Sequence, residues 1–385
     1  MKFLIFITQF YQISGAEKLA IDLAKNLATR NINVHILSMY SKDIPGVKPV
    51  ADELEHLGIA ISYLGLPINA SPLTIIAGIA RFRKFINSNN FTAIEASSIG
   101  PQTICALATI GIKVPILCGI HAIFERRMHN SLKQKIWRYA MKFRTGLRFY
   151  AISHAVANAW NEYIGLKSNS VPIIYNSISE EFFTVLPESE AVRSELAIPA
   201  NSKIILFVGS LMRYKGIDIL YNSIGPILEE NNCYLVLIGE GNKAESFYPA
   251  DKSFYIKLDE QIKNSSWSSR VKFLGNRKDV ARIMASSTVL AHPTRTEGFG
   301  LVLVEALAAG LPVAATKVGG IPEVLEGTKS ILVPSENPKA MQTAILDLLK
   351  SSPSDRQEMI SIGRMRAANF TTTKRVDEII KLASH

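Results

Sequence analysis

The hydrophobic positions of this chain fall into two recurring patterns. Short apolar runs predict buried strands, and longer stretches with apolar residues three and four positions apart predict amphipathic helices. In residues 16–29, for example, Leu19, Leu23 and Leu27 share one helical face, and Lys18 lies on the other. The predicted strands are 3–8, 34–39, 59–64, 92–96, 115–120, 149–153 and 171–175 in a first series, and 203–208, 234–238, 271–274, 289–292, 312–316 and 331–333 in a second.

Helical patterns separate the strands in both series, which predicts two parallel sheets, each covered by helices. Ser71 before Pro72 and Asn337 before Pro338 are typical helix starts. A chain of 385 residues also exceeds the size at which one hydrophobic core stops growing. We therefore expect an α/β protein of two doubly wound domains, with the polar segment 180–203 as the junction.

Composition narrows the class of protein. Apolar residues make up 48% of the chain, yet there is no run long enough to cross a membrane, and residues 1–8 are too short an apolar start for a signal peptide. Cys105, Cys118 and Cys233 are widely spaced in apolar surroundings, which favours buried reduced thiols over disulfides or a metal cluster. We expect a cytoplasmic protein.

The net charge of +10 lies entirely in the N-terminal part. Residues 1–170 carry 19 Lys and Arg against 9 Asp and Glu, whereas residues 171–385 carry 24 of each. Residues 126–161 contain no acid and predict a basic amphipathic helix. Two functional interpretations are contact with anionic lipid at the inner face of the cell membrane and contact with a lipid-linked acceptor. The alternative is that the basic side of the helix is an ordinary solvated surface. Its candidate contact residues are Arg126, Arg127, Lys133, Arg138 and Lys142. Nucleic acid is disfavoured because no recognition motif accompanies the charge.

Two glutamates stand eight positions apart where a strand is followed by a helix. Glu297 falls on the loop after the strand 289–292, and Glu305 lies within the helix that Gly310 ends. Ligands of parallel sheets bind at the carboxyl ends of the strands, beside helix N-termini that attract phosphate. Carboxylates accept strong hydrogen bonds from sugar hydroxyls. The pattern therefore predicts a site for a phosphorylated sugar.

This segment resembles the Glu-x7-Glu signature of retaining, nucleotide-sugar-dependent glycosyltransferases of family 4, which have the GT-B fold of two Rossmann-like domains facing a cleft. The resemblance implies that Glu297 contacts the donor sugar and that Glu305 binds the ribose. It also implies donor contacts from the residues between them, Gly298, Phe299, Gly300 and Leu301. The expected domains are 1–178, which binds the acceptor, and 179–369, which binds the donor, with 370–385 returning to the first.

The loop from Gly209 to Gly216 resembles the phosphate loop of the same family. By this resemblance Lys215 holds the diphosphate, and Ser210 stands where the family usually has arginine, so that Arg213 is the candidate to replace the missing cation. Cations beside a diphosphate leaving group lower the reaction barrier by electrostatic stabilisation. Slow donor turnover is expected if Arg213 points into solvent.

Weaker resemblances follow in the family's order along the chain. Gly15, in a loop of the Gly-Gly-Ala-Glu type with Ser14 as its first residue, lies where the backbone approaches the donor. His121 follows the strand 115–120 and matches the family's cleft histidine, which binds near the transferred sugar. Gly241 and Arg277 complete the donor half. The Gly239-x-Gly241 pair lacks the third glycine of a dinucleotide fingerprint, and the chain has no Asp-x-Asp metal motif.

The resemblance implies a metal-independent hexosyltransferase without a cofactor. Its donor is a UDP- or GDP-linked sugar and its acceptor a glycan or lipid-linked sugar, in bacterial surface polysaccharide or glycolipid synthesis. Three alternatives remain at this point: a nucleotide-sugar epimerase of the same fold, a sugar-nucleotide-binding protein without catalysis, and a membrane-surface protein.

Overall fold

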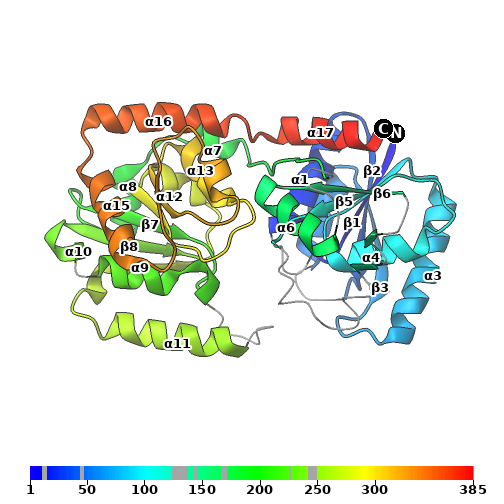
Figure 1. Cartoon of the computed structure of the whole chain (residues 1–385), viewed down its shortest axis with the longest axis horizontal. Coiled ribbons are helices and arrows are strands. Elements are labelled where there is room, and N and C mark those ends of the chain that lie inside the picture. Colours follow the sequence, from blue (N-terminus) through cyan, green and yellow to red (C-terminus); the bar gives the residue numbers. More distant parts are fainter. Residues whose placement is uncertain are drawn as a thin grey trace. The chain divides into compact units, whose positions relative to one another are not determined.

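The computed structural model describes residues 1–10, 15–43, 47–123, 138–139, 141–142, 146–165, 171–225, 227–241 and 249–384. These residues form two compact units (Figure 1). Unit 1 comprises Met1–Ser177 and Thr372–His385, and unit 2 comprises Ile178–Thr371. Each is built on one six-stranded parallel sheet with helices around it, which is the α/β architecture that the hydrophobic pattern predicts.

The sheet of unit 1 has the strand order β3-β2-β1-β4-β5-β6. Its strands are β1 (Lys2–Ile7), β2 (Asn33–Tyr40), β3 (Ala60–Leu66), β4 (Ala93–Ala96), β5 (Ile116–Ile120) and β6 (Leu147–Ala151). Its helices are α1 (Gly15–Thr29), α2 (Val47–His56), α3 (Pro72–Asn89), α4 (Ile99–Ala108), α6 (His154–Ile164) and α17 (Thr372–Ser384). The predicted strand 171–175 is wrong, because only an isolated bridge from Ile173 to Ala151 forms there.

The C-terminal helix α17 packs into unit 1. Val376 and Ile379 are fully buried in the core that also contains β1 and α1. Arg148 donates to the carbonyls of Leu382 and Ala383 at the end of the helix. The chain's last helix therefore completes the first unit.

The sheet of unit 2 has the strand order β12-β11-β10-β7-β8-β9. Its strands are β7 (Lys203–Val208), β8 (Cys233–Ile238), β9 (Val271–Gly275), β10 (Val289–His292), β11 (Val313–Thr316) and β12 (Ile331–Val333). Its helices are α7 (Glu181–Thr184), α8 (Ser189–Glu195), η2 (Arg213–Lys215), α9 (Ile217–Ile224), α10 (Ile227–Glu230), α11 (Pro249–Lys263), η3 (Ser268–Arg270), α12 (Val280–Ala285), α13 (Leu301–Ala309), α14 (Ile321–Val324), α15 (Pro338–Lys350) and α16 (Pro353–Ala367).

The segment 180–203 is not the junction that its polarity predicts. It lies wholly in unit 2 and forms α7 and α8. Two of its acids form ion pairs within that unit, since Arg282 contacts both Glu188 and Glu195. A polar segment can therefore belong to a folded unit when its charges have partners there.

The helix starts at Ser71 and Asn337 are confirmed. The Ser71 side chain accepts a hydrogen bond from the Thr74 amide, and Asn337 accepts one from the Ala340 amide. The three cysteines are buried and free. None of the described helices is both long and apolar enough to cross a bilayer.

Candidate functional site

The site in unit 2 begins with the loop after β7. This loop leads into the short helix η2, which ends at Lys215 and is followed by Gly216 as its cap. Gly216 has a positive φ of 71°, and a Cβ atom there would lie 2.0 Å from the carbonyl oxygen of Pro293. Only glycine fits this contact. The loop after β7 is thereby pressed against the loop after β10.

The close approach brings Lys215 and Glu297 together. The Lys215 ammonium donates to Oε2 of Glu297 at 2.8 Å, and their side chains are 19% and 16% exposed. His292, at the end of β10, lies beneath, with Nε2 at 3.4 Å from the same oxygen. Burial alone would raise the pKa of Glu297, but the neighbouring His292 and the charge of Lys215 outweigh it and lower the pKa to about 2. Glu297 is therefore an anion at neutral pH.

Sequence reasoning missed Arg295, which holds the two loops in register. Its guanidinium forms a two-pronged contact with Asp218, at 2.7 and 2.9 Å, and also contacts Glu336 and the carbonyl of Arg213. Its backbone amide donates to the Tyr214 carbonyl at 2.8 Å. These contacts use all five N–H donors of the guanidinium. The signal in the sequence was only that an arginine stands near Glu297, because its partners are far away along the chain.

The helix after the glutamate loop is α13, and Glu305 lies in its second turn. Gly300 precedes the helix with a φ of 93°, which favours glycine. Glu305 and Leu301 are half-buried. Phe299 is 1% exposed and packs edge-on against Phe370, with ring centroids 5.4 Å apart. Its side chain therefore serves the core, and only its backbone can reach a ligand.

Two more candidates, Gly209 and Gly241, lie at the same edge of the sheet. Gly239 approaches the loop after β7 so closely that a Cβ atom would lie 2.0 Å from the carbonyl oxygen of Gly209. A Cβ atom on Gly241 would lie 1.9 Å from the ring of Tyr255. Gly239 thus lets two backbone segments meet at the carboxyl edge of the sheet, and Gly241 leaves room for the Tyr255 ring.

Arg277 is engaged in an ion-pair cluster. It contacts Asp279 at 2.8 Å and Glu195 at 2.7 Å, and Arg282 contacts the same two carboxylates. Hydrogen bonding from Arg277 is the main cause that lowers the pKa of Asp279 to about 2. The cluster joins α8 to α12. In this structure the guanidinium of Arg277 is directed to protein carboxylates.

The two unusual residues of the phosphate loop differ in their surroundings. The Ser210 hydroxyl lies 3.2 Å from the hydroxyl of Tyr214. The Arg213 side chain is exposed, while its carbonyl is held by Arg295. Lys215 is thus the loop cation that the fold fixes in place.

Unit 1 contains a separate pocket of about 370 Å³ at the carboxyl ends of its strands. His121, directly after β5, lines it together with Thr8, Ser97 and the start of α4. Both ring nitrogens of His121 are buried and have no hydrogen-bond partner among the residues that the structure describes. Burial, and then the charge of Arg375, lower the pKa of His121 to about 3, so the ring is neutral. Gly15, the first residue of α1, is exposed, and residues 12–14 of its loop lie outside the described residues.

Beneath this pocket lies a buried polar cluster that sequence reasoning also missed. Glu95 is fully buried and accepts hydrogen bonds from Ser97 and from the Tyr150 hydroxyl, the latter at 2.9 Å. A Cβ atom on Gly119 would lie within 2.7 Å of Ser97, Tyr150 and His121. Burial raises the pKa of Glu95. Gly119 therefore lets the side chains of Ser97, Tyr150 and His121 converge at one point.

Of the predicted basic helix, Arg126, Arg127 and Lys133 lie outside the described residues. Arg138 stacks over the ring of Tyr163, 5.7 Å from its centroid, and Lys142 donates to the Gly165 carbonyl at 2.9 Å. These two residues thus pack against α6 of their own unit. In the described ranges, no three His, Cys, Asp or Glu side chains gather as metal ligands would.

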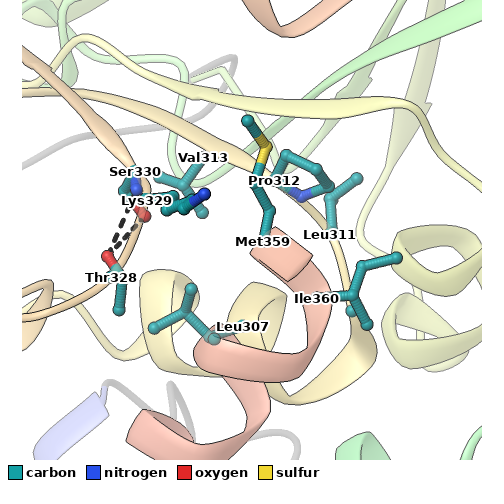
Figure 2. Close-up of a pocket in the computed structure, with 11 residues that line it drawn as sticks. Leu307, Leu311, Pro312, Val313, Thr328, Lys329, Ser330, Met359 and Ile360 are labelled. Atoms are coloured by element: carbon teal, nitrogen blue, oxygen red, sulfur yellow. Dashed lines mark hydrogen bonds between the residues drawn. The ribbon is translucent and has the colours of Figure 1, made fainter. Parts of the chain in front are cut away.

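A further pocket lies at the other end of α13 (Figure 2). It is lined by residues such as Leu307, Pro312 and Met359, and its volume of about 10 Å³ has room for no more than one water molecule. This hollow is therefore a packing defect between α13 and α16 rather than a ligand site.

The comparisons with known proteins agree with this geometry. Residues 202–351 match the family model of glycosyl transferases group 1, and residues 13–182 match that of glycosyltransferase family 4. The chain is 24% identical over 332 residues to N-acetyl-alpha-D-glucosaminyl L-malate synthase of Bacillus anthracis, covering 85% of this chain and 82% of that protein. It is 32% identical over 211 residues to D-inositol 3-phosphate glycosyltransferase of Corynebacterium diphtheriae, covering 53% and 48%.

Among solved structures, the chain is similar to Anabaena HepE in complex with UDP-glucose. The TM-score is 0.83 at 22% sequence identity, and the alignment covers all of both chains. This likeness establishes the fold as GT-B. A basic residue and an anionic carboxylate fixed side by side, at a sheet edge where backbone amides are also available, can bind a diphosphate and a polyhydroxylated sugar.

Proposed function

We propose that this chain, which belongs to the family 4, group 1 glycosyltransferases, transfers a sugar from a nucleotide diphosphate to a glycan or lipid-linked acceptor. The transfer retains the configuration of the sugar. The observation that carries the proposal is the contact between Lys215 and Glu297 in unit 2. It presents a cation for a diphosphate and a carboxylate for sugar hydroxyls at one point. Support comes from one relative named as a D-inositol 3-phosphate glycosyltransferase, from another named as an N-acetyl-alpha-D-glucosaminyl L-malate synthase, and from the similar HepE, which was solved in complex with UDP-glucose.

In this proposal unit 2 holds the donor. Lys215 binds the diphosphate, with Arg213 as a second cation that swings in from solvent. Glu297 accepts hydrogen bonds from the sugar and Glu305 from the ribose. The glycine-rich segments around Gly209, Gly241 and Gly298–Gly300 let the backbone approach the nucleotide. The Lys215–Glu297 contact must open when donor binds, because each group then acquires a ligand partner.

The chemistry needs no nucleophile from the protein. The bond between the anomeric carbon and the diphosphate oxygen breaks, and the acceptor oxygen attacks from the same face of the sugar. The acceptor proton passes to the departing phosphate. Lys215 stabilises the negative charge that develops on this phosphate. His121, neutral and buried in unit 1, positions the transferred sugar by hydrogen bonding. We expect no metal ion in the reaction.

A donor screen tests the proposal. UDP- and GDP-linked sugars are titrated into the protein by calorimetry, and the slow hydrolysis of any ligand is followed by NMR. We expect one nucleotide sugar to bind, and its hydrolysis to release the sugar first in the donor's own anomeric form. Glu297→Gln should abolish hydrolysis, whereas the matched variant Glu358→Gln, whose carboxylate pairs with Lys329, should not. Release of an isomerised nucleotide sugar would instead identify an epimerase.

A further inference from the structure

The outward face of helix α3 is apolar where a surface helix is normally polar. Leu73 and Ile76 are 78% and 62% exposed, and Ala77 and Ala80 continue the same stripe at helical spacing. The opposite face is already packed, with Phe82 among its buried residues. The first half of α3 is thus apolar on both sides, although among the described residues of unit 1 only its inner side is packed.

The second half of the same face is basic. Arg81, Arg83 and Lys84 are all exposed, and residues 57–94 contain no Asp or Glu. Arg83 donates to the carbonyls of Ala108 and Ile110, at 2.8 and 2.7 Å. It thereby fixes the end of α4 beside α3. Ile110, which is 57% exposed, extends the apolar surface there.

We propose that this surface, the α3 face of Leu73, Ile76, Ala77, Ala80, Arg81 and Lys84, docks on an anionic lipid bilayer. Apolar side chains can enter the acyl boundary while adjacent basic side chains meet anionic headgroups. Charge argues against a second copy of the chain as the occupant. Two such faces would bring basic groups together without any acid from α3 to pair with them.

Docking on a bilayer deepens the proposed function, because a lipid-linked acceptor lies at such a surface. The purpose of docking therefore rests on the proposed function. Docking itself does not require a donor. It also assigns the contact to a surface other than the predicted basic helix 126–161, of whose candidate contact residues Arg138 and Lys142 bind their own unit.

Vesicle sedimentation tests the inference with the full chain. Vesicles of phosphatidylcholine mixed with phosphatidylglycerol are compared with vesicles of phosphatidylcholine alone. Each basic residue near an anionic surface contributes about fivefold to partitioning, so the pair Arg81→Gln and Lys84→Gln should weaken binding about 25-fold. The pair Leu73→Ser and Ile76→Ser should weaken it by at least about tenfold. Arg83 stays in place because it fixes the end of α4.

The matched control is the pair Leu186→Ser and Met365→Ser in unit 2, which are 77% and 64% exposed. We expect it to bind vesicles as the wild type does. All variants should keep the wild-type melting temperature and donor affinity, which separates loss of docking from loss of the proposed function. The inference is overturned if the wild type does not bind the anionic vesicles, or if it binds the neutral vesicles equally well. It also fails if the control pair loses as much vesicle binding as the α3 variants do. A third contrary result is that the α3 variants convert a dimer into monomers and leave vesicle binding unchanged.

Discussion

Replacing Arg295 by lysine should reduce stability and donor affinity together. The guanidinium contacts Asp218 at 2.7 and 2.9 Å and Glu336 at 3.0 Å, and it also holds the carbonyl of Arg213. A lysine keeps the charge but has no planar fork, so it cannot span these partners. The side chain of Arg295 is 20% exposed, and those of Asp218 and Glu336 are 29% and 61% exposed.

The magnitude follows from this burial. Partly buried hydrogen bonds to charged groups contribute about 1.5–3 kcal/mol, whereas exposed pairs contribute about 0–1 kcal/mol. The ion pair with Glu336 therefore contributes little to the free energy of unfolding. The loss from Arg295→Lys is that of roughly one charge-assisted bond, on the order of 2 kcal/mol. Because Arg295 also holds the loop that carries Lys215, donor affinity should fall about tenfold, which corresponds to about 1.4 kcal/mol.

Arg282→Lys is the matched control. Arg282 also binds several carboxylates and its side chain is 25% exposed, but it lies on α12 and does not contact the phosphate loop. Urea unfolding should show a similar loss of stability for both variants. Calorimetry with the nucleotide sugar should show lost affinity only for Arg295→Lys. The reasoning is refuted if Arg295→Lys binds donor as tightly as the wild type, or if Arg282→Lys loses as much affinity.

Three further predictions concern the local geometry. Gly216→Ala should cost at least about 2 kcal/mol in urea unfolding, because its Cβ atom would meet Pro293, whereas Gly275→Ala, with a positive φ but open space, should cost only about 1 kcal/mol. The pKa of Glu297 is lowered to about 2, so its ionisation stabilises the fold above pH 4.5 and this contribution is lost as pH falls towards 2. Between pH 4.5 and 2, the free energy of unfolding of the wild type should therefore fall by on the order of 3 kcal/mol more than that of Glu297→Gln. Equal pH profiles of stability would contradict this. Tyr150→Phe should destabilise the protein by about 1–3 kcal/mol in thermal unfolding, because Glu95 loses a buried donor; an unchanged melting temperature would argue against the buried cluster.

Much of the fold can be predicted from the sequence because parallel strands that are buried on both faces appear as continuous apolar runs. The strand 289–292 is predicted with its observed bounds for this reason. The segment 171–175 has the same appearance, but it pairs only through Ile173 beyond the edge strand β6. Apolar character alone does not tell whether a neighbouring strand is available.

The site was only partly predictable for a related reason. Lys215 and Glu297 stand in motifs, so each was identified, but their direct contact depends on Gly216 fitting against Pro293. The roles of Arg295 and Glu95 arise from partners far away in the sequence, and no local pattern marks them. Likewise, the apolar outer face of α3 becomes evident only when the helix is seen packed on its other side.

The central claim is that Lys215 holds the diphosphate of a sugar nucleotide. The most direct test is calorimetric titration of the preferred nucleotide sugar into wild type, Lys215→Met and Lys329→Met. Lys329 also pairs with a glutamate, but it lines the small hollow at the other end of α13. We predict that Lys215→Met weakens donor binding by at least about tenfold, as expected for the loss of a charged contact of about 1.5–3 kcal/mol, while Lys329→Met binds as the wild type does. Equal affinity of Lys215→Met and wild type, or no binding of any nucleotide sugar to the wild type, would contradict the account.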